Sequence, residues 1–299
     1  MTPRIAFVGF GEAGQAMAAG LREHGVAHIA AWDILFAEAA GETLIEAART
    51  IGIRVASSAS DAVREADIVI AAVTAASSIE AARSVAGHLR GRPLYLDVNS
   101  VSPGRKQATA TLLGDDARYV DVAIVSAIHP ARHKSPMMLA GPNAAEAEPV
   151  LAALGMKTQT VGGEVGAAAA IKMIRSVMIK GIEALTLECF LAAARAGVTD
   201  QVAVSLRNNY PGVDWSKMSE YNIERMASHG IRRAAEMREV ADTLREVGVR
   251  PLMTASTIER QQQLGEIGRE PQVRQAVAKG RTDMLNEVSK AVDAYERTR

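Results

Sequence analysis

A glycine-rich turn near the start of the chain constrains the fold more than any other feature. Gly9, Gly11 and Gly14 have the spacing GxGxxG, directly after the apolar run 5–10 and directly before helical spacing over 13–24. In this context the first glycine allows a tight turn, the second lets a pyrophosphate approach the backbone, and the third packs helix against strand. The helix N-terminus adds free N–H groups and a partial positive charge. The segment therefore predicts a strand, a turn and a helix that bind a dinucleotide.

The predicted cofactor site extends beyond the three glycines. Asp33 closes the next apolar run, 19 residues after Gly14. A carboxylate there accepts hydrogen bonds from both ribose hydroxyls and repels a 2′-phosphate, so the pattern favours NAD, with NADP as the other possibility. The residues that we expect at the cofactor are Gly9, Phe10, Gly11, Glu12, Ala13, Gly14, Asp33, Val73, Thr74 and Asn99.

Short apolar runs alternate with helical segments through the first half of the chain. The apolar runs are 5–10, 28–32, 68–73, 94–97, 119–125 and 137–140, and the helical segments are 13–24, 38–51, 80–89, 104–113 and 144–154. Continuous apolar strands between helices indicate parallel strands that are covered on both faces. This order predicts an α/β Rossmann domain with a parallel-rich, doubly wound sheet.

The composition changes near Gly162 and Gly163. Residues 164–196 contain no proline, and at 1.5 Å per residue they would form one helix about 50 Å long. Helical composition then continues to the end of the chain. We therefore place the Rossmann domain at 1–163 and an all-α domain for substrate binding and dimerisation at 164–299, joined by the long helix.

A second polar segment follows the apolar run 94–97. Ser102 is a good helix N-cap and Pro103 suits the first helical position, so a purely structural role explains both residues. It does not explain Asn99 and Ser100, which lie at the carboxyl end of a parallel strand, where open α/β sheets bind ligands. We expect Ser100 to face a ligand.

A third signal lies on the long helix, where Lys172, Ser176 and Lys180 recur at helical spacing. Two lysines in so apolar a helix could simply reach past it to water. Beside a nicotinamide cleft, however, a partly desolvated lysine near another cation can exchange a proton with a substrate hydroxyl.

Overall composition excludes several classes of function. The 34 basic and 34 acidic residues cancel, so no global field draws the chain to nucleic acid or to an anionic membrane. No apolar run is long enough to predict a membrane-spanning helix. Cys189 is the single cysteine, which excludes a multi-cysteine metal site and fits a reducing compartment. We expect a cytoplasmic protein without a metal.

With these motifs, the chain resembles the β-hydroxyacid dehydrogenase family, which includes 3-hydroxyisobutyrate and 6-phosphogluconate dehydrogenases. The resemblance covers essentially the whole chain and rests on the glycine motif, on 97–103 (Asp-x-Asn-Ser-x-Ser-Pro) and on 163–176. It implies a Rossmann domain, a long linking helix and an all-α domain through which the chain forms a homodimer or homotetramer. It also implies that Lys172 is catalytic and takes the proton of a substrate hydroxyl as hydride leaves for the nicotinamide.

The chain departs from the family pattern at three places. Ser176 replaces an asparagine four residues after the lysine, and 121–127 lacks the glycines of the family's substrate segment. Ala235-Glu236 stands where the family has a Lys-Asp pair, and the nearby Arg232 and Arg233 could supply the missing cation. These departures indicate a divergent branch with a distinct C-terminal helical domain.

The resulting hypothesis is an NAD(P)-dependent dehydrogenase that acts on the CH–OH group of a small 3-hydroxy acid or sugar acid, or on its oxo form. We assign the catalytic role to Lys172, Ser176 and Ser100, and substrate contacts to Asn99, Ser126, Lys180, His129 and Arg233. The alternative for the basic loop 126–134 is that it is an ordinary surface loop without a substrate contact. Three other functions remain open: an imine reductase-type enzyme, a decarboxylating sugar-acid dehydrogenase, and a non-enzymatic NAD(H)-binding sensor.

Overall fold

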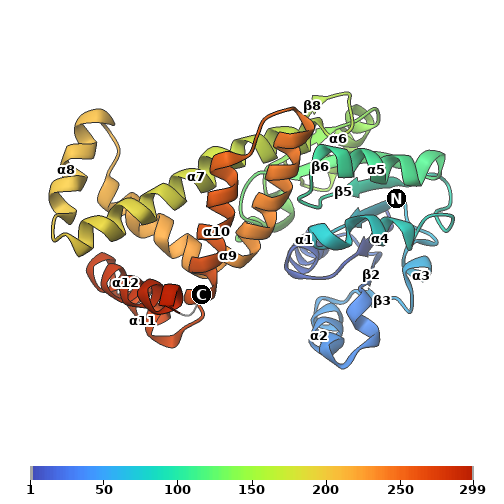
Figure 1. Ribbon diagram of the computed structural model, residues 1–299. Helices are drawn as coiled ribbons and strands as arrows, with labels where there is room; N and C mark the ends of the chain where they lie inside the picture. The colour runs from blue at the N-terminus through green and yellow to red at the C-terminus, as the bar shows by residue number, and fades with distance from the viewer. Residues whose placement is uncertain (1–2, 298–299) are drawn as a thin grey trace. The chain divides into compact units, whose positions relative to one another are not determined.

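The computed structural model describes residues 3–297, and its chain forms two compact units, Met1–Met173 and Ile174–Arg299. The division falls within one continuous helix, α7 (Ala167–Arg195), which begins in the first unit and ends in the second. The sequence places the domain boundary at residue 163, just before this helix begins. In Figure 1 the first unit runs from blue to green and the second from yellow to red.

An eight-stranded sheet forms the centre of the first unit, with strand order β3-β2-β1-β4-β5-β6-β7-β8. The strands are β1 (Ile5–Val8), β2 (Ile29–Trp32), β3 (Arg54–Val55), β4 (Ile68–Ala71), β5 (Leu94–Asp97), β6 (Arg118–Ile124), β7 (Met137–Ala140) and β8 (Thr158–Gly162). Every neighbouring pair is parallel except β6 and β7. The predicted parallel-rich Rossmann sheet is confirmed.

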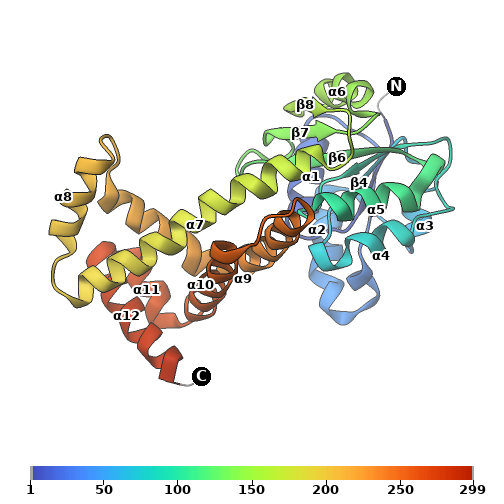
Figure 2. The same ribbon diagram turned by 45° about the horizontal axis from the view of Figure 1, so that its top comes forward.

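Helices cover both faces of this sheet (Figure 2). One face carries α1 (Glu12–Glu23), α2 (Glu42–Ile51) and α6 (Ala144–Ala153), and the other carries α3 (Ala59–Val63), α4 (Ser78–Arg83) and α5 (Pro103–Leu113). Successive strand side chains point to opposite faces. Accordingly, Ile5 and Phe7 pack with the first set of helices, and Ala6 and Val8 with the second. This double cover is why the strands read as continuous apolar runs.

The structure corrects several predicted elements of the first unit. The helix expected over 38–51 begins only at Glu42, because two short 3₁₀ turns occupy the preceding segment. The helix expected over 80–89 spans only Ser78–Arg83. Strand β8 was not predicted, since its sequence Thr-Gln-Thr-Val-Gly lacks an apolar run and it lies at the edge of the sheet.

The order of the strands fixes where a ligand can bind. Strand β1 lies between β2 and β4, so the chain reverses its direction of winding there. In open α/β sheets the crevice at such a switch point, beyond the carboxyl ends of the strands, is the usual ligand site. The segments after β1, β4 and β5 all begin at that edge.

The second unit is entirely helical within the described residues. After α7 come α8 (Thr199–Asn209), α9 (Trp215–Glu246), α10 (Leu252–Ile267), α11 (Pro271–Lys279) and α12 (Arg281–Arg297). A common core joins these helices, with Phe190 and Met226 among its buried members. Helices α9 and α10 approach so closely that a Cβ on Gly230 would lie 2.2 Å from the carbonyl oxygen of Gln261. Among the residues described, no helix combines the length and apolar character needed to cross a membrane.

Candidate active site

The glycines of the turn after β1 are required for two different reasons. Gly9 has φ +93°, and a Cβ there would lie 2.4 Å from the Ala72 carbonyl oxygen, so the backbone itself requires glycine. A Cβ on Gly14 would lie 2.6 Å from the Gly9 carbonyl oxygen. Gly11 has an ordinary φ of −73°, and a Cβ there would meet nothing within 4 Å. Nothing in the protein's own packing calls for glycine at Gly11, whereas a phosphate that approaches this backbone would.

The turn leads directly into α1, whose first residues are Glu12 and Ala13. The Glu12 side chain is exposed. The N-cap residue is Gly11, which has no side chain, so the first N–H groups of the helix receive no side-chain capping bond. Free N–H groups and the positive end of the helix dipole form a site for an anion.

Asp33 ties the end of β2 to the glycine turn. Its Oδ2 accepts a hydrogen bond from the Phe10 N–H at 2.7 Å, and its Oδ1 accepts one from the Leu35 N–H at 3.0 Å. Each carboxylate oxygen has a second lone pair, so the group can still accept from ribose hydroxyls. Asp33 therefore fixes the shape of the turn and also presents a negative charge beside it.

The turns after β4 and β5 are joined by a side chain. Asn99 is buried, and its Oδ1 accepts a hydrogen bond from the Val73 N–H at 2.7 Å. Thr74, the next residue, is exposed. The predicted N-cap is confirmed, since Ser102 accepts from the Arg105 N–H and Pro103 opens α5. Asn99 therefore holds together the two turns that border the predicted cofactor site.

Lys172 and Ser100 meet within the first unit. The Lys172 Nζ donates a hydrogen bond to the Ser100 Oγ at 2.5 Å, although the two residues are 72 positions apart in the sequence. Both side chains are partly exposed. The structure thus brings an amine and a hydroxyl together just beyond the carboxyl end of β5, next to β4 in the sheet.

The first unit also contains a buried charged cluster that the sequence analysis missed. Lys106, on α5, is 1% exposed, and its Nζ lies 3.0 Å from the Asp97 Oδ1 and 3.5 Å from the Asp121 Oδ1. The Tyr119 hydroxyl donates to the Asp97 Oδ2 at 2.7 Å. Burial and the neighbouring Asp97 raise the pKa of Tyr119 well above its ordinary value, so the phenol keeps its proton and remains a donor. A signal for this cluster was available, because apolar runs 94–97 and 119–125 each contain one aspartate.

Ser176 and Lys180 lie in the second unit, further along α7. Ser176 is 1% exposed, and the Lys180 Nζ donates to its Oγ at 2.9 Å. Lys180 also lies 3.3 Å from the Glu236 Oε1 on α9. Burial is the main cause that lowers the pKa of Lys180, while Glu236 opposes this shift. Lys180 therefore places a cation beside Glu236, and the suggestion that Arg232 or Arg233 supplies one stays a prediction.

Arg233 has a different set of partners. Its guanidinium donates through Nε, at 3.1 Å, and through a terminal nitrogen to the Glu183 carboxylate. The Gln261 Nε2 donates to the same carboxylate at 2.8 Å. Arg233, predicted from the sequence to contact substrate, thus forms an ion pair with Glu183 that joins α9 to α7. Both side chains are buried. The role of Arg233 as a substrate ligand stays a prediction.

The loop between β6 and β7 holds the remaining predicted substrate residues. Ser126 and His129 are exposed, and the His129–Pro130 peptide bond is cis. The Ser126 hydroxyl donates to the Ala127 carbonyl oxygen at 3.1 Å. The structure leaves both side chains accessible, and their role as substrate contacts stays a prediction.

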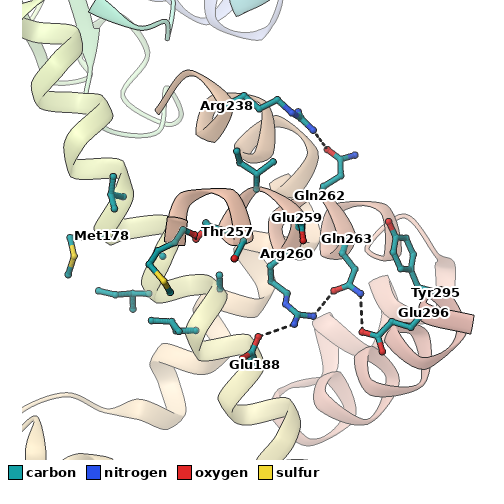
Figure 3. A pocket seen from close by; sticks show the side chains of 18 residues that line it. Met178, Glu188, Arg238, Thr257, Glu259, Arg260, Gln262, Gln263, Tyr295 and Glu296 are labelled. Atoms are coloured by element: carbon teal, nitrogen blue, oxygen red, sulfur yellow. Dashed lines mark hydrogen bonds and ion pairs between the residues drawn. The ribbon is translucent and has the colours of Figure 1, made fainter. Parts of the chain in front are cut away.

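The second unit also has an open groove of about 1060 Å³ along α7, α10 and α12 (Figure 3). Its floor includes the exposed apolar side chains of Met178, Leu185 and Met253. Polar side chains border it, among them Arg260, which bonds to Glu188 at 3.0 Å. The groove contains none of the predicted catalytic residues. Across residues 3–297, no group of three or more His, Cys, Asp or Glu side chains is placed to hold a metal ion.

Two sequence families match parts of the chain. Residues 4–100 match a family described as NADP oxidoreductase, coenzyme F420-dependent. Residues 193–264 match a domain of unknown function, DUF1932. The first match lies in the Rossmann unit and the second in the helical unit.

Solved structures extend the similarity over both units. A conserved hypothetical protein from Sinorhizobium meliloti 1021 is 33% identical, with 97% of each chain covered and a TM-score of 0.80. MTH1747, a conserved protein of unknown function described as structurally similar to 3-hydroxyacid dehydrogenases, is 32% identical over 88% of this chain and 97% of its own, with a TM-score of 0.72. The 3-hydroxyisobutyrate dehydrogenase of Mycobacterium tuberculosis, solved with L-serine, is 19% identical over 95% and 98% of the chains, and its TM-score of 0.71 shows the shared fold.

Proposed function

Because the chain belongs to a divergent β-hydroxyacid dehydrogenase-like family with a C-terminal helical domain, we propose that it transfers a hydride between a nicotinamide cofactor and a small 3-hydroxy acid or sugar acid, or its oxo form. The observation that carries this proposal is the hydrogen bond from the Lys172 Nζ to the Ser100 Oγ. In this proposal the Lys172 amine would serve as the proton acceptor, at the same edge of the sheet as the glycine turn.

The glycine turn fits a dinucleotide. Gly11 leaves open the space that a pyrophosphate would fill, and the first N–H groups of α1 border that space. When bound, the nicotinamide supplies the hydride donor or acceptor. We assign NAD as the preferred form, because the Asp33 carboxylate beside the turn would repel a 2′-phosphate.

Lys172 and Ser100 would handle the proton. In the oxidative direction the neutral Lys172 Nζ accepts the proton from the substrate hydroxyl, and in the reductive direction the ammonium returns it to the forming oxygen. The Ser100 Oγ, already bonded to this nitrogen, aims the amine and can accept or donate a further hydrogen bond to the same substrate oxygen.

Further polar groups would hold the rest of the substrate. Lys180 and Ser176 follow Lys172 on the same helix, and we retain them as the groups that favour an anionic substrate. Ser126 and His129 contribute from their exposed loop. Asn99 supports the site indirectly, through its bond to the Val73 N–H.

We also propose that the chain assembles as a homodimer or homotetramer through its helical unit. The groove along α7 and α10 exposes Met178 (64%), Leu185 (58%) and Met253 (63%), a concentration of apolar surface typical of an interface. Light scattering on the purified protein tests this proposal. A monomer at micromolar concentration would contradict it.

Three alternatives predict different reactions. An imine reductase-type enzyme needs an amine together with the oxo compound before the reduced cofactor is consumed. A decarboxylating sugar-acid dehydrogenase releases carbon dioxide with the reduced cofactor. An NAD(H)-binding sensor binds the cofactor and turns over nothing. Lys172 beside Ser100 favours an enzyme over the sensor, because binding alone needs no proton acceptor.

A turnover screen tests the proposed function. Oxidation and reduction of NAD and NADP are followed with a panel of 3-hydroxy acids, sugar acids and their oxo forms, with and without a small amine. Lys172→Met is assayed beside the wild type, and binding of NADH to both is measured by fluorescence. The proposal expects turnover that falls about 10²- to 10⁴-fold in the variant, with NADH binding retained. Equal turnover in the two proteins would contradict it.

A further inference from the structure

Lys106 is a charged side chain placed where water cannot reach it. It projects from α5 and is 1% exposed, and its ammonium meets acceptors from the sheet. The Nζ lies 2.5 Å from the Asp97 carbonyl oxygen, 3.0 Å from the Asp97 Oδ1 and 3.5 Å from the Asp121 Oδ1. Burial of a lysine is costly, so a position that keeps one calls for a reason beyond packing.

The two carboxylates stand directly beside each other. Asp97 on β5 pairs in register with Asp121 on β6, and both are 0% exposed. Adjacent strands are about 4.8 Å apart, so without a cation between them two ionised carboxylates would repel each other strongly in this dry interior. Lys106 neutralises one of the two charges and leaves the cluster with one negative charge in excess.

Asp121 links this cluster to the helix that carries Lys172. Its Oδ2 accepts hydrogen bonds from the Gly166 and Ala169 N–H groups, each at 3.1 Å. Gly166 directly precedes α7 and Ala169 lies in its first turn, where N–H groups lack partners inside the helix and where a negative charge is favoured. Lys172 follows Ala169 by three residues, less than one helical turn. The Asp121 carboxylate therefore fixes the start of the helix from which Lys172 projects.

Asp97 links the same cluster to Ser100. Its Oδ1 accepts a hydrogen bond from the Asn99 N–H at 3.0 Å, one residue before Ser100. Lys106 thus lies between the two backbone segments that carry the donor and the acceptor of the Lys172–Ser100 bond. Gly166 reinforces the contact of α5 with α7, since it has φ +101° and a Cβ there would lie 3.0 Å from the Pro103 Cβ.

We propose that Lys106, acting through Asp97 and Asp121, is a positioning residue that sets the Lys172 amine against the Ser100 hydroxyl. This inference rests on the proposed function, because that function gives the Lys172–Ser100 pair its importance. The contacts that link Lys106 to the pair are independent of the proposed function. Well-packed apolar side chains commonly stabilise an interior at least as well as a buried ion cluster does. The cluster adds orientation that apolar packing lacks. Asp97 orients the backbone before Ser100, and Asp121 orients the start of α7.

The test compares Lys106→Met with Leu113→Ala. Leu113 is a buried core residue on the same helix that takes no part in the cluster, so its truncation lowers stability without touching either aspartate. The first readout is the rate at which an N-hydroxysuccinimide ester acylates Lys172, measured by peptide mass spectrometry. Lys217, whose side chain is 86% exposed in the other unit, is the internal reference.

The proposal expects Lys172 to be acylated several-fold faster in Lys106→Met, because the released amine becomes more accessible, while Lys217 is unaffected. Leu113→Ala should leave the rate at Lys172 unchanged at a comparable loss of thermal stability. If the two variants alter Lys172 equally, Lys106 is only structural and the proposal is wrong. If Lys106→Met does not fold, Lys106→Met/Asp121→Asn replaces it, since that pair of changes keeps the net charge of the cluster.

The second readout uses any substrate found in the turnover screen. The proposal expects kcat to fall about 100-fold in Lys106→Met, as misplacement of a reacting group does, with the Kd for NADH unchanged. Added to Lys172→Met, the same change should lower the residual rate no further, because it acts through Lys172. A further loss in that double variant would contradict the proposal. If no substrate is found, the proposed function fails, but the acylation rate still decides this inference.

Discussion

The two units each contain a buried ion cluster, and the clusters differ in what their charges hold. In the first unit Lys106 lies between Asp97 and Asp121, and the carboxylates also accept hydrogen bonds from backbone N–H groups and from a tyrosine hydroxyl. In the second unit Arg233 pairs with Glu183, a carboxylate that also accepts from the Gln261 side chain. The first cluster orients backbone segments, whereas the second joins side chains of three helices.

This difference suggests that the first cluster serves the proposed reaction and the second serves the stability of the helical unit. The first cluster carries an excess negative charge that the N-terminus of α7 helps to balance, and its carboxylates accept hydrogen bonds from the backbone segments that precede Ser100 and Lys172. The Arg233–Glu183 pair is balanced, one cation to one anion, and it fixes the packing of α7, α9 and α10. We therefore expect changes in the first cluster to affect Lys172 and changes in the second to affect the free energy of unfolding.

The largest expected effect on stability is that of Arg233→Met. The change leaves the Glu183 carboxylate buried without its cation, which should cost about 3–5 kcal/mol of unfolding free energy. Urea unfolding measures this loss. Arg245→Met, at an exposed position on the same helix, is the control and should cost less than about 0.5 kcal/mol. Loss of NADH binding by folded Arg233→Met would break the comparison, because the cofactor turn belongs to the other unit.

A second change to the same pair sharpens the comparison. In Arg233→Met/Glu183→Leu no charge remains unpaired, so most of the stability lost in the single variant should return. The same urea experiment checks this prediction. A double variant no more stable than Arg233→Met would show that the ion pair stabilises the bundle in some other way.

A smaller, purely functional effect is expected at Gly11. Gly11→Ala places a methyl group where the protein has nothing within 4 Å, so it should fold normally. The methyl would occupy the space assigned to the pyrophosphate, and NADH affinity should fall by at least about tenfold, or about 1.4 kcal/mol. Fluorescence titration and thermal unfolding measure the two properties separately. In Gly14→Ala both the NADH affinity and the thermal stability should fall, because the new Cβ would lie 2.6 Å from the Gly9 carbonyl oxygen. Unchanged NADH affinity in Gly11→Ala would remove the main structural support for the cofactor site.

The smallest effect concerns pH. His133 is 4% exposed beside His24, Arg132 and Lys134, and neither ring nitrogen has a hydrogen-bond partner among the described residues. Burial is the main cause that lowers the pKa of His133 in the folded chain. The unfolded chain therefore takes up a proton first as the pH falls. The stability that neutral His133 contributes is complete above its unfolded pKa, about 6.5, and is lost as the pH falls toward the lower folded pKa.

Replacement of His133 by glutamine should accordingly flatten the fall in stability between neutral and mildly acidic pH. His229 in the helical unit also has a pKa lowered mainly by burial, but it is only half-buried, so His229→Gln should flatten that fall less. Thermal unfolding over a pH series compares the two variants. A larger effect at His229 would reverse the expected order.

Local patterns in the sequence were sufficient to predict the local structure at the expected cofactor site. The spacing Gly9-x-Gly11-x-x-Gly14, the acidic end of β2 and the Ser102–Pro103 helix start are each encoded within a few residues. Such signals depend on backbone geometry near one point in the chain. The structure accordingly reproduces the turn, the helix and the N-cap where the sequence placed them.

The buried cluster could be recognised only in part, through the single aspartate in each of the apolar runs 94–97 and 119–125. Lys106, Asp97 and Asp121 come from three elements, and only the register of β5 and β6 brings the two aspartates together. In the sequence Lys106 is one cation among others on a short helix. The partners of Arg233 and Lys180 were hidden for the same reason, since a helical face does not reveal which side chain of another helix meets it. Long-range packing decides these pairs, whereas periodicity reports only one element at a time.

The most direct test of the central claim, that Lys172 exchanges a proton as hydride is transferred, uses deuterium. Wild type and Lys172→Met are incubated with [4,4-²H₂]NADH and the pooled oxo acids, and mass spectrometry measures deuterium bound to carbon in the products. We predict label in one hydroxy acid with the wild type, and about 10²- to 10⁴-fold less with Lys172→Met at equal NADH binding. Equal incorporation by the two proteins would contradict the role of Lys172, and no label with either would contradict the dehydrogenase itself.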